Sequence, residues 1–237
     1  MINSDAFIVS FAFASLTVML FVSARWLYTT TRISLLNPVV VSIIVLAAGL
    51  LGSDIPYQTY EQGGHWIDWF LEPSVVALGY PLYQQLQEIK RDAVKLISVC
   101  AISSCVGILS MIGICALLGL GKDSLTSTAP KAVTTAIAMV ISEEQGGIPA
   151  LTALTVIYAG LLGSLVAIPL MNLTKIHTPK AQGIAMGSAA HALGTARIRE
   201  EGHTHGAYSA LALVLCAIFT ALLTPILLPI ALRLLGY

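Results

Sequence analysis

The stretch Ala129–Pro149, APKAVTTAIAMVISEEQGGIP, decides how the whole sequence is interpreted. The chain around it is mostly apolar and nearly free of charge, whereas this stretch combines a lysine, two adjacent threonines and two adjacent glutamates. Pro130 and Pro149 punctuate its ends, and Gly146-Gly147 precedes the second proline. Inside a bilayer such a segment is costly unless it lines a cavity or packs within protein. It is therefore our first candidate for a substrate site, and the alternative is an amphipathic surface helix between two spans.

The composition of the chain indicates a membrane protein. Hydrophobic residues make up 57% of it and charged residues 10%, with a mean hydropathy of +0.85, whereas about 25% of a soluble domain is charged. The alternative, a soluble protein with five buried helices, fits these values poorly. A helix needs about 20 residues to cross the hydrocarbon layer. Charge-free runs of about that length or more are Ala6–Ala24, Ile33–Ser53, Leu96–Gly121, Gln145–Thr174 and Gly206–Leu232.

Several functional classes lack support in the sequence. The net charge is zero, so no basic surface for nucleic acid is expected. The cysteines lie inside charge-free runs without a CxxC pair or a histidine at ligand spacing, so we predict neither a metal nor a cofactor. No GxSxG, HExxH, P-loop or GxGxxG motif occurs, and we predict that the chain is not an enzyme. No basic residue precedes the first apolar run, which favours a retained span over a signal peptide.

The basic residues predict how the first spans are oriented, because cytoplasmic loops are enriched in Lys and Arg. Arg25 and Arg32 lie between the first two runs, which predicts a cytoplasmic loop there and an external N-terminus. The next loop contains acidic and aromatic residues but no Lys or Arg, as expected outside. A third span then ends at Lys90, Arg91 and Lys95, which we place in the cytoplasm.

The same rule constrains the polar stretch. The run Leu96–Gly121 crosses outward, and the basic residues that follow Thr174 belong inside. Both conditions hold if Ala129–Glu144 enters the membrane and returns to the external side, or if it is a half-helix that does not complete a crossing. In this scheme Ala181–Ala196 crosses outward and Gly206–Leu232 crosses inward, which gives about seven crossings and one re-entrant or broken element.

An internal repeat supports this layout. Pro38 is followed ten residues later by AGLLGS at Ala48–Ser53, and Pro149 by AGLLGS at Ala159–Ser164. Shorter matches follow in the same order, at Ala77–Gly79 with Ala192–Gly194 and at Cys100–Ile102 with Cys216–Ile218. Because the two halves cross in opposite directions in the scheme above, we predict an inverted repeat, as in many secondary transporters.

Together these patterns predict an all-α, polytopic, transporter-like membrane protein with one membrane domain. Its predicted parts are an N-terminal transmembrane helix (1–32), a first repeat (33–121), a re-entrant or broken polar element (122–144) and a second, inverted repeat (145–237).

The candidate substrate-binding residues lie near the expected helix breaks. Lys131, at an expected half-helix start after Pro130, is suited to meet a carboxylate, with hydroxyls from Thr134 and Thr135; its alternative role is to extend toward the interface. His191 lies in a charge-free stretch and titrates near neutral pH, so it is a candidate for anion binding or proton coupling. The alternative for His191 is a hydrogen-bonded core histidine.

Further candidates are less specific. Thr195 follows His191 in the same stretch. Arg197 stands where that span should end, with topology anchoring as the alternative. Glu143, beside Gly146-Gly147, is a second candidate for proton coupling, although adjacent acids are more typical of a wet loop. Asn37 precedes Pro38 where carbonyls could be exposed, and Tyr80 offers a hydroxyl beside the helix-breaking Pro81.

At these same positions the sequence resembles the LrgB/CidB family. The resemblance runs from about Arg32 to the end of the chain. Five motifs carry it, in order: LLNPVVV (Leu35–Val41), EPSVVALGYPLYQQ (Glu72–Gln85), PKAVTTAIAM (Pro130–Met139), GGIPALTA (Gly146–Ala153) and GSAAHALGTAR (Gly187–Arg197).

The resemblance implies a multi-pass protein of the bacterial inner membrane with a smaller, holin-like partner of the LrgA/CidA type. The family is labelled antiholin-like, with effects on murein hydrolase activity and autolysis. Plastid relatives export glycolate and import glycerate, and bacterial relatives are linked to pyruvate uptake. We therefore expect a secondary transporter of small hydroxy- or keto-carboxylates (glycolate, glycerate, pyruvate or lactate) that works by alternating access. The alternative is an antiholin-like regulator that acts with the LrgA/CidA-type partner; the other expected partners are membrane lipid and a second copy of the chain.

Overall fold

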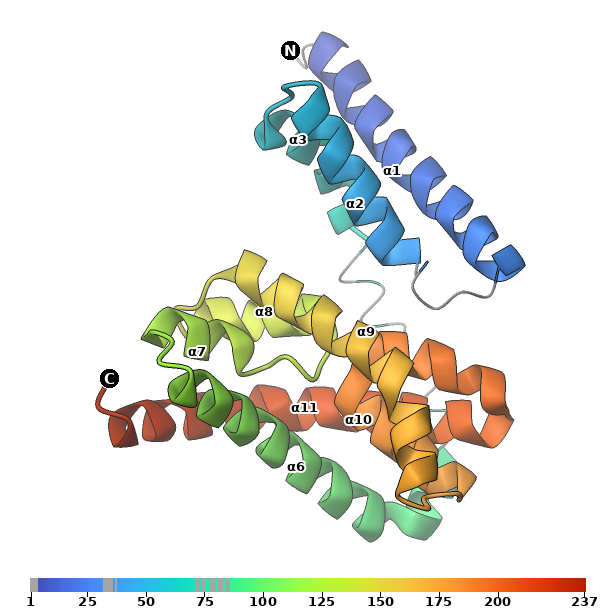
Figure 1. The fold of residues 1–237 in the computed structure, drawn as a ribbon, viewed down its shortest axis with the longest axis vertical. Helices are drawn as coiled ribbons and strands as arrows, with labels where there is room; N and C mark the ends of the chain where they lie inside the picture. Colours follow the sequence, from blue (N-terminus) through green and yellow to red (C-terminus); the bar gives the residue numbers. More distant parts are fainter. Residues whose placement is uncertain are drawn as a thin grey trace. The chain divides into compact units, whose positions relative to one another are not determined.

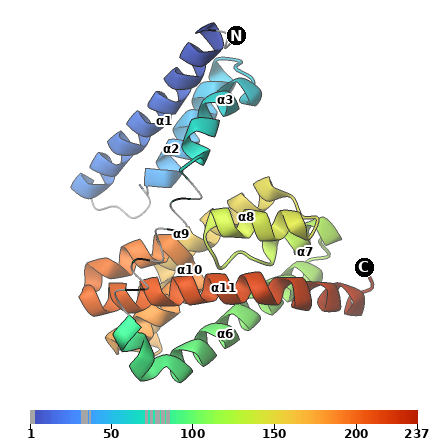
Figure 2. The ribbon, with the colours of Figure 1, turned by 180° about the vertical axis from the view of Figure 1, so that it is seen from behind.

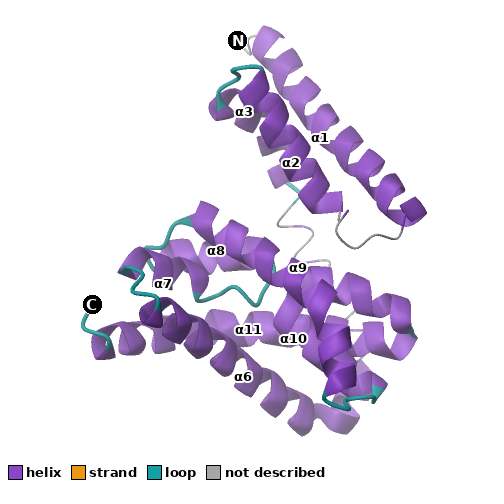
Figure 3. Cartoon of the chain, in the orientation of Figure 1, coloured by secondary structure: helices purple, strands orange, loops and turns teal. Residues whose placement is uncertain are grey.

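The computed structural model describes residues 4–31, 36, 38–70, 73, 76, 80, 83 and 86–237. Within these residues every regular element is a helix (Figures 1 and 3), so the all-α prediction is confirmed for this part of the chain. The chain forms two compact units, Met1–Ala77 and Leu78–Tyr237. Four helices in the described residues are long and apolar enough to cross a membrane: Ile8–Thr31, Ala93–Leu117, Pro149–Leu173 and His203–Leu234.

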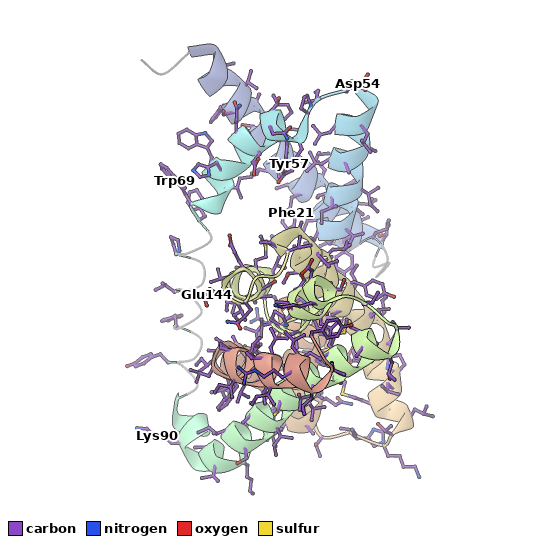
Figure 4. The ribbon with its side chains drawn as sticks, turned by 90° about the vertical axis from the view of Figure 1, so that its left-hand side faces the viewer. Phe21, Asp54, Tyr57, Trp69, Lys90 and Glu144 are labelled. Atoms are coloured by element: carbon purple, nitrogen blue, oxygen red, sulfur yellow. The ribbon has the colours of Figure 1, made fainter. Side chains whose placement is uncertain are left out.

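The first unit is built around helix α1 (Ser4–Thr31), which packs against α2 (Pro38–Gly52) and α3 (Tyr57–Asp68). The rings of Phe13 on α1 and Tyr60 on α3 meet edge to face with centroids 5.8 Å apart. The Thr17 hydroxyl lies 3.1 Å from the Tyr60 hydroxyl. Aromatic side chains of this kind favour the boundary between hydrocarbon and water, and Figure 4 shows Tyr57 at the start of α3 and Trp69 directly after its end. The predicted third span, from Leu71 to Ile89, lies largely outside the described residues.

Three long helices frame the second unit, and two of them run in the same direction. They are α6 (Leu86–Leu117), α9 (Pro149–Leu173) and α11 (His203–Leu234). At one end Leu96 of α6 packs in one cluster with Tyr208 and Leu211 of α11. At the other end the Tyr237 hydroxyl donates to the carbonyl oxygen of Leu120 over 3.0 Å. Helices α6 and α11 are therefore parallel, and Figures 1 and 2 show them side by side.

Between α6 and α9 the chain forms a short helical hairpin instead of a span. Helix α7 (Lys122–Thr128) has 7 residues and α8 (Thr135–Glu144) has 10, about 10 Å and 15 Å at 1.5 Å per residue. Neither length crosses a hydrocarbon layer of about 30 Å, as predicted for this stretch. After α8 the backbone N–H of Ile148 donates to the Ser127 hydroxyl of α7 over 2.8 Å. The chain therefore leaves the hairpin beside α7, the helix with which the hairpin begins.

Proline and glycine explain why this hairpin breaks where it does. Pro130 has no N–H, so it cannot donate to the carbonyl of Thr126, and α7 ends at Thr128. The next helix begins only at Thr135, so Lys131 lies in the non-helical link and not at a half-helix start as predicted. Helix α8 ends with Gly146 in the left-handed region at φ 78°, and the N–H of Gly147 bonds the carbonyl of Ser142 over 2.8 Å, as in a Schellman motif.

Helix α10 (Pro179–Ile198) is a second hairpin. It bends at His191, whose backbone has φ 40° and ψ −134°. Past the bend a Cβ on Gly194 would come 3.1 Å from the carbonyl oxygen of Met186, a contact that a straight helix does not allow between residues eight apart. The outer ends of both arms lie at the start of α11, Gly183 against His205 and Arg199 against Gly206. The prediction that Ala181–Ala196 crosses the membrane is therefore wrong.

The folded-back α10 also corrects the predicted directions of the spans. With α10 returning to its own side, only α9 crosses between α6 and α11, and these two helices run parallel. The prediction that Leu96–Gly121 and Gly206–Leu232 cross in opposite directions is wrong for that reason. The matched segments Cys100–Ile102 and Cys216–Ile218 lie on these two parallel helices, whereas inverted halves require them to be antiparallel.

Candidate functional site

The tips of the two hairpins meet in the middle of the second unit. The first tip is the link Ala129–Thr134 between α7 and α8, and the second is His191. Val133 of the link packs in one cluster with Val156 of α9 and Ala217 of α11. The Nε2 atom of His191 lies 2.9 Å from the carbonyl oxygen of Val156. Ala217 lies near the middle of α11, and Val156 lies about a third of the way along α9, so both tips end in the interior of the second unit.

Lys131 contributes a cation at this junction. The side chain is partly buried, and Val133, two residues further along the link, packs in the same cluster as Val156, whose carbonyl bonds His191. Within the described residues Lys131 takes part in no salt bridge. A charged amine is strongly disfavoured among apolar helices unless an anion or polar groups accompany it. The position is therefore suited to attract an anion.

The link also presents the beginning of α8. Thr134 is the N-cap residue of this helix, and its hydroxyl makes no cap hydrogen bond. The Thr134 Oγ1 atom is buried and has no hydrogen-bond partner among the described residues. Thr135 is the first residue of α8. The first N–H groups of a helix lack partners within the helix, so these donors and the Thr134 hydroxyl add to the attraction of Lys131 for an anion.

His191 is held tightly at the second tip. Its side chain is only 3% exposed. The carbonyl of Val156 can only accept, so the Nε2 atom of His191 carries the proton of this bond, and Nδ1 makes no hydrogen bond within the described residues. The ring lies against Gly160 of α9, where a Cβ would come within 2.6 Å of it. His191 is therefore both a hydrogen-bonded core residue and part of the junction, and its positive φ is a strain worth about 1–3 kcal/mol.

The other predicted site residues lie apart from the tips. Thr195 is buried and shares a 2.8 Å hydrogen bond with Ser209 of α11. Arg197, at the base of the α10 hairpin, pairs with Glu200 at 3.4 Å and Glu201 at 3.0 Å.

Two further candidates, Glu143 and Tyr80, lie away from this junction. Glu143 is exposed at the outer end of α8, where Figure 4 labels its neighbour Glu144. Tyr80 is 65% exposed, and Asn37 lies outside the described residues. The structure thus brings the segment with Lys131, Thr134 and Thr135 and the residue His191 to the same part of α9, around Val156.

A hydroxyl network that the sequence analysis missed fixes the base of the first hairpin. The Thr152 hydroxyl of α9 donates to Ser142 of α8 over 2.7 Å, and Ser127 of α7 accepts from Ile148. All three of these hydroxyl residues are fully buried. Hydrogen bonds of this type join helices where water is scarce. Serines and threonines scattered through apolar helices were the only signal in the sequence.

The described residues contain no group of three or more His, Cys, Asp or Glu side chains placed to hold a metal ion. The candidate site consists instead of an ammonium, an imidazole, hydroxyls and backbone N–H groups. Such a set binds anions with hydrogen-bond acceptors, carboxylates among them.

Comparison with known proteins identifies the family. The family model described as "LrgB-like family" matches residues 17–230. The chain belongs to the LrgB-like family. This LrgB-like chain is 37% identical over 200 residues to an uncharacterized protein of Haemophilus influenzae, covering 84% of each chain. It is 34% identical to the uncharacterized protein YxaC of Bacillus subtilis, covering 86% of this chain and 88% of that one.

A further relative has a functional name. The holin-like protein CidB of Staphylococcus aureus is 31% identical over 210 residues, covering 87% of this chain and 90% of its own. No solved structure matches the LrgB-like chain.

Proposed function

We propose that this LrgB-like protein is a secondary transporter of small hydroxy- or keto-carboxylates, in the class of glycolate, glycerate, pyruvate and lactate. The observation that supports it best is that the tips of two hairpins, one containing Lys131 and the other formed by His191, meet at Val156 in the interior of the second unit. Binding sites of secondary transporters lie near the membrane midplane at broken helices, whose N-terminal ends face anionic substrate groups. Carrier function needs no bond-making chemistry, which fits the prediction that the chain is not an enzyme.

The paired hairpins suggest how access could alternate. The base of the α7–α8 hairpin lies beside the end of α6, whereas the base of the α10 hairpin lies beside the start of α11. These bases are at opposite ends of the second unit, since α6 ends where α11 ends. Withdrawing one tip would open the junction toward one end only. We infer that each hairpin gates one side.

The distribution of basic residues supports an orientation for this multi-pass arrangement. Cytoplasmic ends of spans are enriched in Lys and Arg. We therefore propose that the start of α11 faces the cytoplasm of a bacterium and that the C-terminus faces outward, with the chain in the inner membrane. The proposed cytoplasmic end has Lys90, Arg91, Lys95, Lys175, Lys180, Arg197 and Arg199, and the other end has Lys122 and Arg233.

Uptake into proteoliposomes that contain only this chain tests the proposal. Labelled glycolate, glycerate, pyruvate and lactate are offered with and without an inward proton gradient. We expect saturable uptake of at least one acid and its loss in Lys131→Met. Lys122→Met is the matched control, because Lys122 is exposed at the base of the same hairpin, and it should retain uptake. Absence of uptake for all four acids, or full uptake by Lys131→Met, contradicts the proposal.

A holin-like or antiholin-like role is the second candidate. The name of the CidB relative favours it, and it would involve a smaller membrane partner of the LrgA/CidA type. Here the expected result is a change in autolysis and murein hydrolase activity only when both proteins are present. The same Lys131→Met variant separates the two candidates, because a regulator that binds no carboxylate should keep its effect on autolysis.

A further inference from the structure

Two threonines of α11 have buried hydroxyls with no hydrogen-bond partner among the residues that the structure describes. Thr220 is 1% exposed and Thr224 is fully buried, yet neither hydroxyl has a hydrogen-bond partner among the described residues. Threonines elsewhere in these helices donate to the carbonyl four residues earlier, as Thr128 and Thr155 do. That local bond is the usual solution for a hydroxyl in an apolar helix. Its absence leaves two donors in a place where an unpaired polar group is costly.

The two threonines lie on α11 between residues that pack with the first hairpin. Ala217, Thr220, Thr224 and Leu228 follow each other at intervals of three and four residues, so they form one stripe along α11. At one end of the stripe Ala217 shares a cluster with Val133 of the link. At the other end Leu228 shares a cluster with Ala129, where the link begins. Thr220 and Thr224 lie on this stripe between two residues that share clusters with the link.

The hairpin side of this contact has unused polar groups as well. Thr126 is 1% exposed and its hydroxyl also has no hydrogen-bond partner within the described part of the chain. The Thr134 hydroxyl, at the far end of the link, is in the same condition. Lys131 lies between these two threonines in the chain. Four hydroxyls without a protein partner therefore border the segment that contains the ammonium.

We propose that Thr220 and Thr224 form a hydroxyl subsite that binds the oxygen on carbon 2 of a small carboxylate whose carboxylate group is held at Lys131. This subsite rests on the proposed function, and its two threonines would determine which carboxylates the transporter accepts. A rotatable hydroxyl donates to a keto oxygen and both donates to and accepts from a hydroxyl. A carboxylate without an oxygen on carbon 2 would leave these buried hydroxyls unpaired. A site built to hydrogen-bond a substrate group rejects the analogue that lacks it for this reason.

The test compares two acids that differ only in that oxygen. Binding of lactate and propionate to the detergent-solubilised full chain is measured by ligand-induced thermal stabilisation and by competition against uptake of the best labelled acid. We expect the wild type to prefer lactate. Thr220→Val and Thr224→Val keep the side-chain shape, and each should weaken lactate binding about three- to tenfold while propionate binding is kept or improved. Thr220→Ser should restore the preference for lactate.

Thr155→Val is the matched control, since the Thr155 hydroxyl already bonds the carbonyl of Leu151 over 2.7 Å. It should leave the ratio of lactate to propionate affinity unchanged. A wild type that binds both acids equally, or valine variants that keep the wild-type ratio, overturns the subsite while carboxylate binding stands. A wild type that binds and transports neither acid nor any of the other carboxylates overturns the proposed function itself.

Discussion

The Nε2 atom of His191 lies 2.9 Å from the carbonyl oxygen of Val156, and the Val156 side chain packs in the cluster that contains Val133. One residue of α9 therefore bonds the tip of the second hairpin and packs in the same cluster as the tip of the first. A movement of either tip should disturb the packing around Val156. This relationship couples the two broken elements in a way that neither hairpin alone would provide.

Gly160 should be essential for the position of the His191 ring at the tip of the α10 hairpin. A Cβ at this position would come 2.6 Å from Cε1 and 2.7 Å from Nε2 of His191. In Gly160→Ala the ring must move away from Val156, and we expect a loss of about 1–3 kcal/mol of stability, as for other overpacked cores. Thermal unfolding of the detergent-purified protein measures the loss.

Gly113→Ala on α6 is the control for this experiment, since a Cβ there would have no heavy atom within 4 Å. It should be neutral or stabilising, because alanine favours helix more than glycine by about 1 kcal/mol. Equal melting temperatures for the two variants would show that His191 does not depend on the space at Gly160.

The folded-back α10 predicts which loops share a side of the membrane. Single cysteines are introduced at His177, Glu200, Glu144 and Tyr237 in a variant without the four native cysteines. A membrane-impermeant maleimide should label His177→Cys and Glu200→Cys from one side, and Glu144→Cys and Tyr237→Cys from the other. Labelling of positions 177 and 200 from opposite sides would mean that α10 crosses the membrane.

The polar stretch around Lys131 shows how far the sequence could be interpreted. Pro130 and the Gly146-Gly147 pair predict that helices end there, because a proline removes a donor and a glycine accepts the left-handed conformation. The basic residues after Thr174 then exclude a complete crossing. Both arguments depend on local chemistry and charge, and the short helices α7 and α8 agree with them.

The α10 segment shows where such arguments fail. Its alanines and glycines suit a crossing helix as well as a hairpin, and no proline marks the bend at His191. The bend depends on contacts between distant segments, such as Gly187 with the backbone of Ser209 and Gly160 with the His191 ring. Thr220 and Thr224 gave no signal for a similar reason, since only the structure shows that their hydroxyls are buried without a partner among the described residues.

The contact between α6 and α11 should be detectable by cross-linking. The Cys216 thiol lies 3.7 Å from the carbonyl oxygen of Cys100, and the Ser104 hydroxyl lies 3.4 Å from the carbonyl oxygen of Cys216. A membrane-permeant oxidant should therefore form a disulfide between Cys100 and Cys216. If a protease site is inserted after Glu201 and cleaved, the two fragments should stay together until the disulfide is reduced. Cys105→Ala should not affect the cross-link, and Cys100→Ala should abolish it.

The hydroxyl network at the base of the first hairpin should determine its stability. Ser127 is fully buried and accepts the N–H of Ile148 over 2.8 Å, so Ser127→Ala leaves that backbone donor unpaired. The expected loss is about 1–3 kcal/mol, or several degrees in melting temperature for a protein of this size. Ser110→Ala is the control, because Ser110 is exposed and its hydroxyl bonds only the carbonyl of Gly107 in its own helix. If the base of the hairpin positions Lys131, Ser127→Ala should also reduce carboxylate uptake at temperatures below unfolding. A variant that melts earlier but transports normally would mean that the contacts of the link with α9 and α11 are sufficient to hold the tip.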